Sequence, residues 1–421
     1  MSNFILLPEY AEAIQSLQTN PVTFISGAGG TGKSTFIKYI RAKVKNSILL
    51  APTGIAAINI SGRTIHSVFK FPPVFLTPDD IKRTNKTIRQ YLKGTNLLII
   101  DEISMVSSNL VDGMDEFLRL NLGVNKPFGG IPVLLVGDLF QLPPIVTDNT
   151  KPLFDEYYDS PLFFDSACIK ELREKNQFKM IQLKSVLRQK DDTFINILNR
   201  IRTGTDVENA IDELNELVTY ANSAPDGYVQ ITPYNDVSDI TNKRKLDAIA
   251  CTPRTYYGNI TGQFNPKNLP VAQAITLKVG AQVMISKNIS REIINGTVGK
   301  IVELKDCSVI VETKHGKIEV FPTNWDEYGY TVVNGQYTSG IVGTYTQVPL
   351  KLAWSMTIHK VQSATIEKLY VDMDRGSFAP GMLYVALSRA VTLDGLILSK
   401  PLEYNDVIVD EKVINFYNTY M

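Results

Sequence analysis

The sequence has little of what marks a secreted, metal-binding or membrane-spanning protein. Its 421 residues contain three Cys and three His, and no Cys-x-x-Cys spacing occurs, which argues against a disulfide framework or a zinc site. No apolar run approaches the roughly 18 residues of a membrane span. The N-terminus also lacks a basic segment followed by an apolar one. We therefore expect a cytoplasmic protein with no membrane partner.

The chain also lacks an excess of charge of either sign, because Lys and Arg number 43 and Asp and Glu number 43. No global positive field would steer a nucleic acid to it, although a local basic groove remains compatible with this balance. The composition is otherwise that of a globular protein, with 44% apolar and 20% charged residues. At roughly 100 to 200 residues per domain, the length predicts two to four domains.

Two series of short apolar strands alternate with helical patterns, which predicts α/β domains with parallel sheets. The first series lies between residues 22 and 185, and the second includes Val229–Thr232, Tyr370–Asp372 and Leu396–Leu398. Between residues 286 and 346, β-branched and aromatic runs replace the helical periodicity, which predicts a small all-β insertion. The segment Lys70–Phe75 is too rich in proline for a helix interior, so we expect an exposed excursion there.

The strongest chemical signal is a GxxxxGKS motif, Gly27–Ser34, between an apolar strand and a helical pattern. Its glycines let backbone N–H groups wrap a polyphosphate, while Lys33 neutralises the β- and γ-phosphates and Ser34 holds Mg²⁺. We therefore expect ATP and Mg²⁺ as cofactors. The predicted nucleotide-binding residues are Gly27, Gly29, Gly30, Thr31, Gly32, Lys33, Ser34 and Thr35.

Two further strand ends carry polar residues suited to phosphate chemistry. Asp101 and Glu102 follow an apolar strand, where an Asp would bind Mg²⁺ and the neighbouring Glu would activate water. Gln141 follows the strand at Val133–Val136 and would meet the γ-phosphate. Alone, the two acids are more typical of solvated side chains at a strand end, and Gln141 is more typical of a proline-terminated turn. Beside the GxxxxGKS motif, the catalytic interpretation is favoured.

With these motifs, further blocks in the same order resemble the Pif1-like branch of the superfamily 1 DNA helicases. The blocks are Ala51–Ala57, Gly62–Phe69, Phe128–Gly130, Leu187–Gln189, Trp354–Gln362 and Tyr384–Ala390. The chain departs from the family pattern at two places. The stretch Leu7–Tyr10 has no glutamine that would read adenine, and Ser363 stands where the family has glycine.

The resemblance implies two RecA-like domains, 1A and 2A, with ATP in the cleft between them. It assigns residues 1–63 and 79–184 to domain 1A, 185–285 and 347–421 to domain 2A, 286–346 to an SH3-like 2B insertion, and 64–78 to a small 1B wedge. It implies that Lys33, Glu102 and Gln141 are catalytic. It also implies that Arg188 and Arg389 act as arginine fingers on the γ-phosphate, although isolated arginines more often form surface ion pairs.

The same resemblance implies a track for single-stranded DNA, lined by small polar, basic and aromatic side chains that suit phosphate contacts and base stacking. The predicted DNA-binding residues are Thr53, Thr64, His66, Phe69, Thr357, His359 and Lys360. Phe69, Phe71 and Phe75 are also candidates for a wedge that separates the strands.

The expected function is that of an ATP-dependent DNA helicase, moving 5′ to 3′ by resemblance. We expect it to act as a monomer on single-stranded DNA and on forked or tailed duplexes. A nucleic-acid-stimulated ATPase that remodels complexes without unwinding DNA stays open as an alternative. A P-loop kinase or transport ATPase is disfavoured, because it has no use for the last two blocks.

Overall fold

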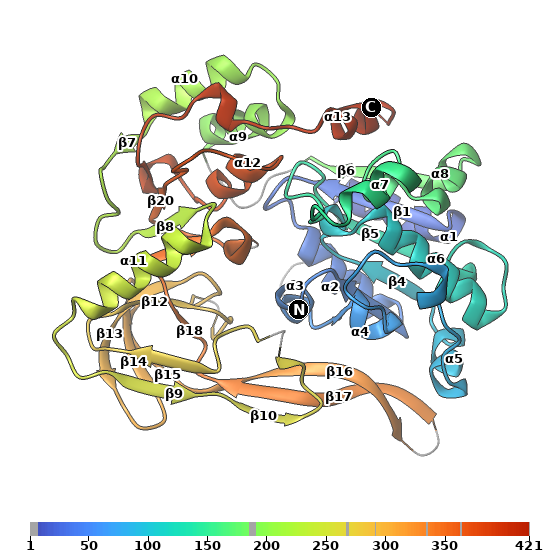
Figure 1. Ribbon diagram of the computed structural model, residues 1–421, viewed down its shortest axis with the longest axis horizontal. Helices are drawn as coiled ribbons and strands as arrows, with labels where there is room; N and C mark the ends of the chain where they lie inside the picture. The colour runs from blue at the N-terminus through green and yellow to red at the C-terminus, as the bar shows by residue number, and fades with distance from the viewer. Residues whose placement is uncertain are drawn as a thin grey trace.

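The computed structural model describes residues 7–184, 191–266, 269–290, 292–333, 336–362 and 364–420. Figure 1 shows one α/β unit at the right, a second at the upper left and a β-rich region below. We call these the first unit, the second unit and the β-rich region (residues 254–352). Among the described residues, no helix is both long and apolar enough to cross a membrane.

A six-stranded parallel sheet forms the centre of the first unit, in the order β3-β2-β4-β5-β1-β6. The strands are β1 Val22–Gly27, β2 Ser47–Ala51, β3 Arg63–Thr64, β4 Leu97–Ile100, β5 Val133–Gly137 and β6 Phe178–Leu183. Strands β1, β4 and β5 are buried throughout, as in a sheet covered on both faces. The sequence predicts strands at residues 22–26, 48–51, 97–100, 133–136 and 180–183, and the structure confirms each of them within two residues at each end.

Helices cover both faces of this sheet, and they are α1 Pro8–Thr19, α2 Lys33–Lys43, α3 Gly54–Asn59, α4 Ile65–Phe69, α5 Lys86–Lys93, α6 Ser108–Leu122, α7 Lys151–Tyr157 and α8 Ala167–Glu174. Successive strand residues point to opposite faces. Phe24 therefore belongs to one apolar core and Ile25 to the other, the one beneath α1 and α2. The two cores fix the loops that follow β1, β4 and β5 at one edge of the sheet.

The second unit contains a five-stranded parallel sheet in the order β19-β8-β20-β21-β7. Its strands are β7 Thr219–Tyr220, β8 Val229–Thr232, β19 Ser355–Thr357, β20 Leu369–Val371 and β21 Leu396–Leu398, and its helices are α9 Asp192–Thr203, α10 Val207–Leu217, α11 Asn235–Asp247 and α12 Met382–Leu387. The predicted strands β8 and β21 are confirmed residue for residue, and β20 is shifted by one residue.

The last helix, α13 Glu411–Asn418, packs on the first unit, although residues 347–421 were predicted to belong to the second. Val413, Phe416 and Tyr417 join the apolar core of the first unit, and the ring of Phe416 stacks on Phe164 with centroids 4.3 Å apart. The chain therefore returns to the first unit at its C-terminal end. The prediction was wrong here because the helix lies after the last recognisable motif.

The β-rich region begins earlier than the predicted boundary at residue 286. Its main antiparallel sheet has the order β15-β14-β13-β12-β18, with β12 Gln282–Ile285, β13 Val298–Leu304, β14 Val309–Thr313, β15 Gly316–Val320 and β18 Leu350–Leu352. Strands β9 Arg254–Tyr257, β10 Asn259–Gly262 and β11 Ala274–Leu277 also precede residue 286. The sequence hid β12 because that strand is buried on both faces and so resembles a strand of a parallel sheet.

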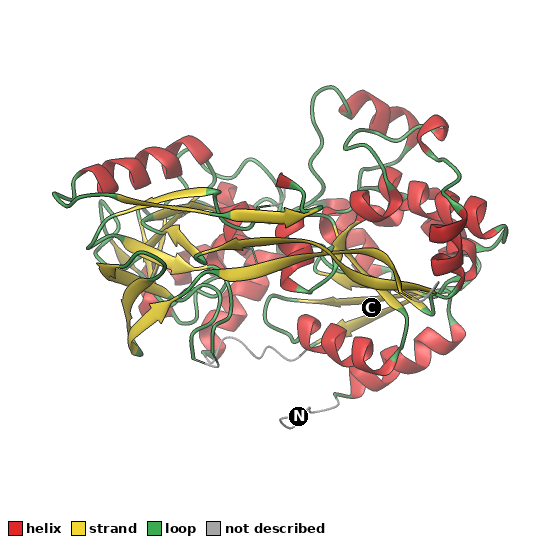
Figure 2. Cartoon of the chain, turned by 90° about the horizontal axis from the view of Figure 1, so that it is seen from below, coloured by secondary structure: helices red, strands yellow, loops and turns green. Residues whose placement is uncertain are grey.

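The β-rich region includes a long hairpin, which consists of β16 Thr323–Val333 and β17 Gln336–Gln347. The hairpin extends to the first unit. There β16 contacts α3, and β17 contacts α5. Figures 1 and 2 show its strands crossing the molecule beneath the first unit. The β-rich region therefore contacts both units.

The predicted aromatic wedge is wrong for this arrangement. Phe69 and Phe71 are buried, their rings stack with centroids 5.4 Å apart, and both pack edge-on against Phe117 of α6. Phe75 packs edge-on against Phe154. The exposed apolar residue of the excursion is Val74, at 59%. The aromatic side chains anchor the proline-rich loop to the core of the first unit.

Candidate functional site

The GxxxxGKS loop folds around its own lysine. Lys33 Nζ donates hydrogen bonds to the carbonyl oxygens of Gly27, at 2.6 Å, and Ala28, at 2.9 Å. Gly30 and Gly32 have φ values of 87° and 91°, a backbone region that glycine enters without strain. The loop leads straight into the first turn of α2, whose N–H groups have no acceptor within the helix and attract anions.

The other predicted nucleotide-binding residues divide between structural and open positions. Thr31 is buried, and its hydroxyl donates to the Ala28 carbonyl oxygen at 3.0 Å. Ser34 and Thr35 are exposed in the first turn of α2. Thr31 therefore shapes the loop, while the hydroxyl groups of Ser34 and Thr35 are accessible to a ligand.

Three carboxylates surround the ammonium group of Lys33. Burial lowers the pKa of Lys33, and the negative charges of Asp138, Glu102 and Asp101 oppose that shift. These carboxylates favour the protonated lysine, which is the form that a polyphosphate binds.

Asp101 and Glu102 lie where β4 ends, as predicted. Asp101 is buried, and its burial together with the charge of Glu102 raises the pKa of Asp101 to about 7. Glu102 has φ 52°, a left-handed conformation that is costly for a residue other than glycine and recurs at functional sites. Mg²⁺ takes one or two carboxylates together with phosphate oxygens, so Ser34 and Asp101 suit such an ion.

Gln141 and Glu102 meet a residue of the second unit. The side-chain nitrogen of Gln362 lies 3.5 Å from a carboxylate oxygen of Glu102 and 3.5 Å from the amide oxygen of Gln141. Gln362 follows the short 3-10 helix Ile358–Val361, which begins after β19. The two predicted catalytic residues of the first unit are thus joined to the second unit by one side chain.

A buried ion pair also joins the two units. Arg202, at the end of α9, donates to both oxygens of Asp138, which follows β5, at 2.7 to 3.1 Å. Neither side chain is more than 5% exposed. Burial alone would raise the pKa of Asp138, but the charge and hydrogen bonds of Arg202 hold it below its usual value. Both groups are therefore charged in the folded protein.

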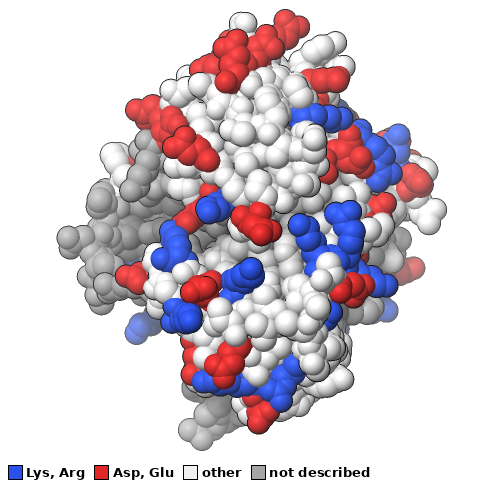
Figure 3. Space-filling view, turned by 90° about the vertical axis from the view of Figure 1, so that its left-hand side faces the viewer, with Lys and Arg blue, Asp and Glu red and all other residues white. Residues whose placement is uncertain are grey.

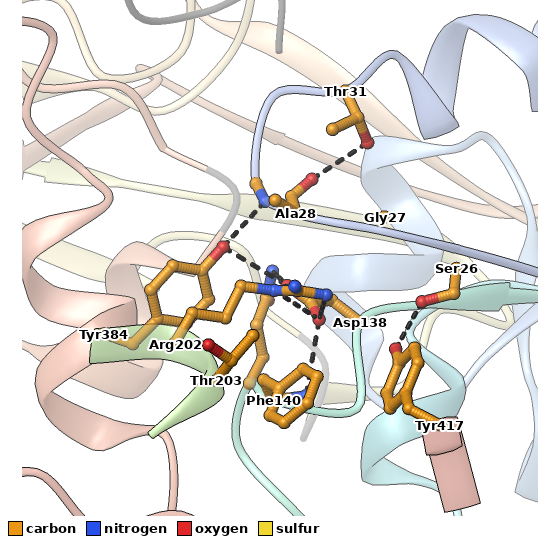
Figure 4. A network of polar contacts seen from close by, with 12 residues as sticks. Ser26, Gly27, Ala28, Thr31, Asp138, Phe140, Arg202, Thr203, Tyr384 and Tyr417 are labelled. Atoms are coloured by element: carbon orange, nitrogen blue, oxygen red, sulfur yellow. Dashed lines mark hydrogen bonds and ion pairs between the residues drawn. The ribbon is translucent and has the colours of Figure 1, made fainter. Parts of the chain in front are cut away.

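Tyr384 of α12 connects this pair to the GxxxxGKS loop, as Figure 4 shows. Its hydroxyl accepts a hydrogen bond from the N–H of Gly29, at 2.9 Å, and donates one to Asp138, at 3.2 Å. Burial and the charge of Asp138 raise the pKa of Tyr384, so the phenol keeps its proton. In this arrangement, the N–H of Gly29 in the phosphate-binding loop is therefore hydrogen-bonded to a hydroxyl of the second unit.

The C-terminal helix reaches the same region. The Tyr417 hydroxyl is hydrogen-bonded to Ser26, and its ring stacks on Phe140 with centroids 4.8 Å apart. The guanidinium carbon of Arg202 lies 4.6 Å from the centroid of the Phe140 ring and 6.0 Å from that of Tyr417. Figure 4 shows these aromatic side chains beside the ion pair.

Asp138, Arg202, Tyr384 and Tyr417 were not predicted as site residues. One signal was present, because Arg202 lies four residues after Leu198 and eight after Phe194, on the apolar stripe of its helix. A charged residue on such a stripe has to find a buried partner. Tyr384 and Tyr417 gave no comparable signal, because aromatic residues are ordinary in a core.

Arg389 is buried and binds the backbone of its own unit in this arrangement. Its guanidinium group donates to the carbonyl oxygens of Val385, at 2.9 Å, and Ala364, at 3.3 Å, and to the Ser388 hydroxyl, at 2.7 Å. Its charge still lowers the pKa of Tyr384, so it lies near the nucleotide side. Its predicted action on a γ-phosphate remains a prediction. Arg188 and Ser363 lie outside the described residues.

The predicted DNA-binding residues fall into two groups. His359 and Lys360 are exposed, Thr53 is exposed, and Thr64 and His66 are partly exposed. Thr53 and Thr64 also cap helices, because their hydroxyl oxygens accept from the N–H groups of Ala56 and Ser67.

Phe69 and Thr357 form the second group, since both are buried at 2% exposure. Phe69 belongs to the apolar core of the first unit, and Thr357 ends β19 inside its sheet. Neither side chain faces a surface that DNA could reach in this arrangement. Both side chains are therefore inaccessible in this arrangement, and their role as DNA contacts stays a prediction.

The stretch that lacks a glutamine contributes a tyrosine to the loop instead. The Tyr10 hydroxyl donates to the Gly32 carbonyl oxygen at 3.1 Å, and its ring stacks on Phe36 of α2 with centroids 4.8 Å apart. Tyr10 therefore fixes the end of the phosphate-binding loop from the N-terminal side.

Comparison with known proteins agrees with this geometry. Residues 9–211 match the model of the PIF1-like helicase family, and residues 265–304 match that of the DNA helicase Pif1 2B domain. The human ATP-dependent DNA helicase PIF1 is 31% identical over 98% of this chain, which spans 64% of the human protein's length.

Solved structures are similar over nearly the whole chain. Pif1 from Bacteroides sp. in complex with ADP-AlF4 is 34% identical, with a TM-score of 0.90 over 99% of this chain and 97% of that one. Bacteroides Pif1 bound to single-stranded DNA has the same identity and coverage but a TM-score of 0.72. The identity and the coverage together show that the chain belongs to the Pif1 helicase family.

Proposed function

We propose that this chain is the motor of an ATP-dependent DNA helicase. The observation that carries the proposal is the meeting of Glu102 and Gln141, from the first unit, with Gln362 from the second. Two groups that we propose to act on the terminal phosphate of ATP thus contact a side chain of a separate body. Binding energy from that phosphate can hold the two bodies together, and its loss on hydrolysis releases them.

The roles of the individual residues follow from their positions. Lys33 and the first turn of α2 bind the β- and γ-phosphates, and Glu102 orients and activates the attacking water. Ser34 and Asp101 would hold a Mg²⁺ ion, which would neutralise charge on the phosphates. Arg389 and Arg188 would stabilise the charge that develops on the transferred group, which requires Arg389 to leave its present carbonyl partners.

The relatives support the substrates proposed here. The Bacteroides protein binds ADP-AlF4 in one structure and single-stranded DNA in another. The present arrangement is more similar to the ADP-AlF4 complex than to the DNA complex, by TM-scores of 0.90 and 0.72. We infer that binding of single-stranded DNA repositions parts of this chain relative to one another.

The finer assignments belong to the same proposal. We propose movement from 5′ to 3′ along single-stranded DNA, action as a monomer on forked or tailed duplexes, and roles for the first unit, the second unit and the β-rich region as domains 1A, 2A and 2B. Thr53, Thr64, His66, His359 and Lys360 are the proposed DNA contacts. The cytoplasmic location is part of the same expectation.

Strand displacement tests the proposal directly. Duplexes with a 5′ tail, a 3′ tail or no tail are incubated with the protein, ATP and Mg²⁺, and the released strand is measured. Release from the 5′-tailed duplex alone supports the full proposal, and release from the 3′-tailed duplex alone contradicts the polarity. ATP hydrolysis that DNA stimulates without release of any strand would favour the alternative, a remodelling ATPase.

A further inference from the structure

A small pocket lies between all three parts of the molecule. Asn59 of α3 lines it from the first unit, Ser286, Asn295 and Lys351 from the β-rich region, and Lys360 and Gln362 from the second unit. Among the described residues that line it, none is Asp or Glu. We call it the Lys351 pocket. It contains amine and amide donors without a carboxylate, which is the chemistry of an anion site.

Lys351 is held in this pocket by the backbone. It lies in the middle of β18 and pairs with Met284 of β12, so its strand cannot withdraw without breaking the sheet. The side chain is half-buried. Burial and then the positive charge of Lys360 lower the pKa of Lys351 to about 8, and no described carboxylate contributes to that shift. The free protein therefore holds two amines close together at an energetic cost.

The neighbouring charged groups do not relieve this cost. Lys287 lies 5.4 Å from the centroid of the Trp325 ring and donates to the backbone of Asn324. The negative charge of Asp326 acts on Lys287, but it is not among the groups that shift the pKa of Lys351. The positive charge at the pocket is thus left for a ligand to neutralise.

We propose that Lys351 and Lys360 together bind one backbone phosphate of the DNA strand, with the amide groups of Asn59 and Asn295 as further donors. A phosphate between two amines replaces their repulsion with two charge-assisted hydrogen bonds. The inference deepens the proposed function, on which it rests, by naming a contact from the β-rich region. Lys360 was predicted as a DNA contact from the sequence, and Lys351 was not.

The position of the pocket gives this phosphate a route to the ATP site. Gln362 lines the pocket and also lies within 3.5 Å of Glu102 and Gln141. A DNA strand held at Lys360 would therefore contact the chain two residues before the side chain that meets Glu102 and Gln141. The pocket and the predicted catalytic groups therefore share one side chain, that of Gln362.

A second cavity also contains lysines, but carboxylates line it as well, so its positive charge is balanced within the protein. It has a volume of about 690 Å³ and is lined by Lys300, Lys314 and Lys368, but also by Asp226 and Glu367. Lys314 is paired with Glu367. On the face that Figure 3 shows, Lys and Arg side chains are interspersed with Asp and Glu and form no single-sign stripe. Lysines of this cavity therefore serve as controls.

The test measures the affinity for a fluorescein-labelled oligothymidylate by anisotropy, with Lys351→Gln, Lys351→Arg and the control Lys368→Gln. Thermal unfolding confirms that each variant is folded. We expect Lys351→Gln to weaken binding about tenfold and to reduce the slope of log affinity against log salt by about 0.7, the value for one phosphate contact on a single strand. Lys368→Gln should match the wild type.

The pH dependence separates this role from a structural one. The wild-type affinity should fall as the pH rises through about 8, because Lys351 loses its proton there. Lys351→Arg should keep the affinity and lose that fall, since arginine stays charged throughout this range. Equal affinities and salt slopes for Lys351→Gln and Lys368→Gln would overturn the inference. A wild type that binds no oligothymidylate would instead overturn the proposed function itself.

Discussion

The two interfaces between the units differ in how their charges are balanced. On the nucleotide side, Arg202 is paired with Asp138, and Tyr384 completes the hydrogen bonds between them and the phosphate-binding loop. At the Lys351 pocket, where we propose that DNA binds, Lys351 and Lys360 lie together with no carboxylate among the described residues that line it. At the first interface, the protein itself supplies both charges of the pair. At the second, we propose that a bound phosphate supplies the negative charge.

This difference has an energetic meaning. A buried ion pair repays its desolvation only when its geometry and its additional hydrogen bonds are good, and the three bonds from Arg202 to Asp138 meet that condition. The pair therefore fixes how α9 sits on the first unit. In the Lys351 pocket, the two lysines gain a negatively charged partner only when a ligand binds. Binding there therefore stabilises the positions of the parts that line the pocket.

The largest effect expected on the nucleotide side comes from Lys33→Ala. Lys33 is held by two loop carbonyls and surrounded by carboxylates, so its removal leaves the phosphates without their main cation. We expect ATP turnover to be nearly abolished while single-stranded DNA binding persists. Steady-state ATPase and anisotropy measure the two. Turnover within threefold of the wild type would contradict the role of Lys33.

Arg389→Ala should lower kcat up to roughly 10³-fold, the lower range for arginine fingers, with a smaller change in ATP affinity. Turnover measured at saturating DNA tests this directly. Full rescue by DNA would show that Arg389 acts on the closure of the cleft instead of on the transferred phosphate. Because Arg389 also binds backbone carbonyls, thermal unfolding of the variant accompanies the assay.

Loss of the buried ion pair between Arg202 and Asp138 should destabilise the protein, whereas loss of an exposed ion pair should not. Asp138→Asn leaves the guanidinium of Arg202 without a counter-charge, and we expect the free energy of unfolding to fall by about 3 to 5 kcal/mol. The control is Lys175→Gln, which removes the partner of Glu171 in an exposed pair and should change stability by less than about 1 kcal/mol. Denaturant unfolding compares the two. Equal losses would contradict the structural role of Asp138.

The smallest effect is expected from Tyr384→Phe, which tests whether the second unit competes with nucleotide for the phosphate-binding loop. Tyr384→Phe removes the hydroxyl that accepts from the Gly29 N–H, so that donor no longer has to leave a protein partner to meet a phosphate. We expect nucleotide affinity to rise about two- to tenfold, the equivalent of one net hydrogen bond. Tyr417→Phe, which loses the bond to Ser26, should leave affinity unchanged. Weaker binding by Tyr384→Phe would mean that the hydroxyl contacts the nucleotide itself.

Prediction from the sequence worked best where local rules decide the structure. The parallel strands and the loop around Lys33 follow from apolar runs and from glycines whose conformations other residues avoid. The acids after β4 lie near Lys33, and Glu102 and Gln141 both lie 3.5 Å from the side chain of Gln362, while their catalytic roles stay predictions. Each strand and each loop among these features depends on residues that are close in the sequence, and the parallel order of the strands brings their ends to one edge of the sheet.

What could not be predicted depends on contacts between distant segments. Arg202 and Asp138 are 64 residues apart, and Tyr417 is 391 residues from Ser26. The burial of Phe69 was hidden for the same reason, because its partner Phe117 lies on another helix. An exposed wedge and a packed anchor have the same local sequence pattern, and only the tertiary structure separates them.

The most direct test is the rate of ATP hydrolysis as a function of oligothymidylate concentration. If an anion on the DNA side completes the interface that reaches Glu102 through Gln362, turnover should rise with DNA and saturate. Lys351→Gln should reach its half-maximal rate at a higher DNA concentration, and that shift should shrink at high salt. Turnover that is the same with and without DNA would contradict the coupling between the two interfaces.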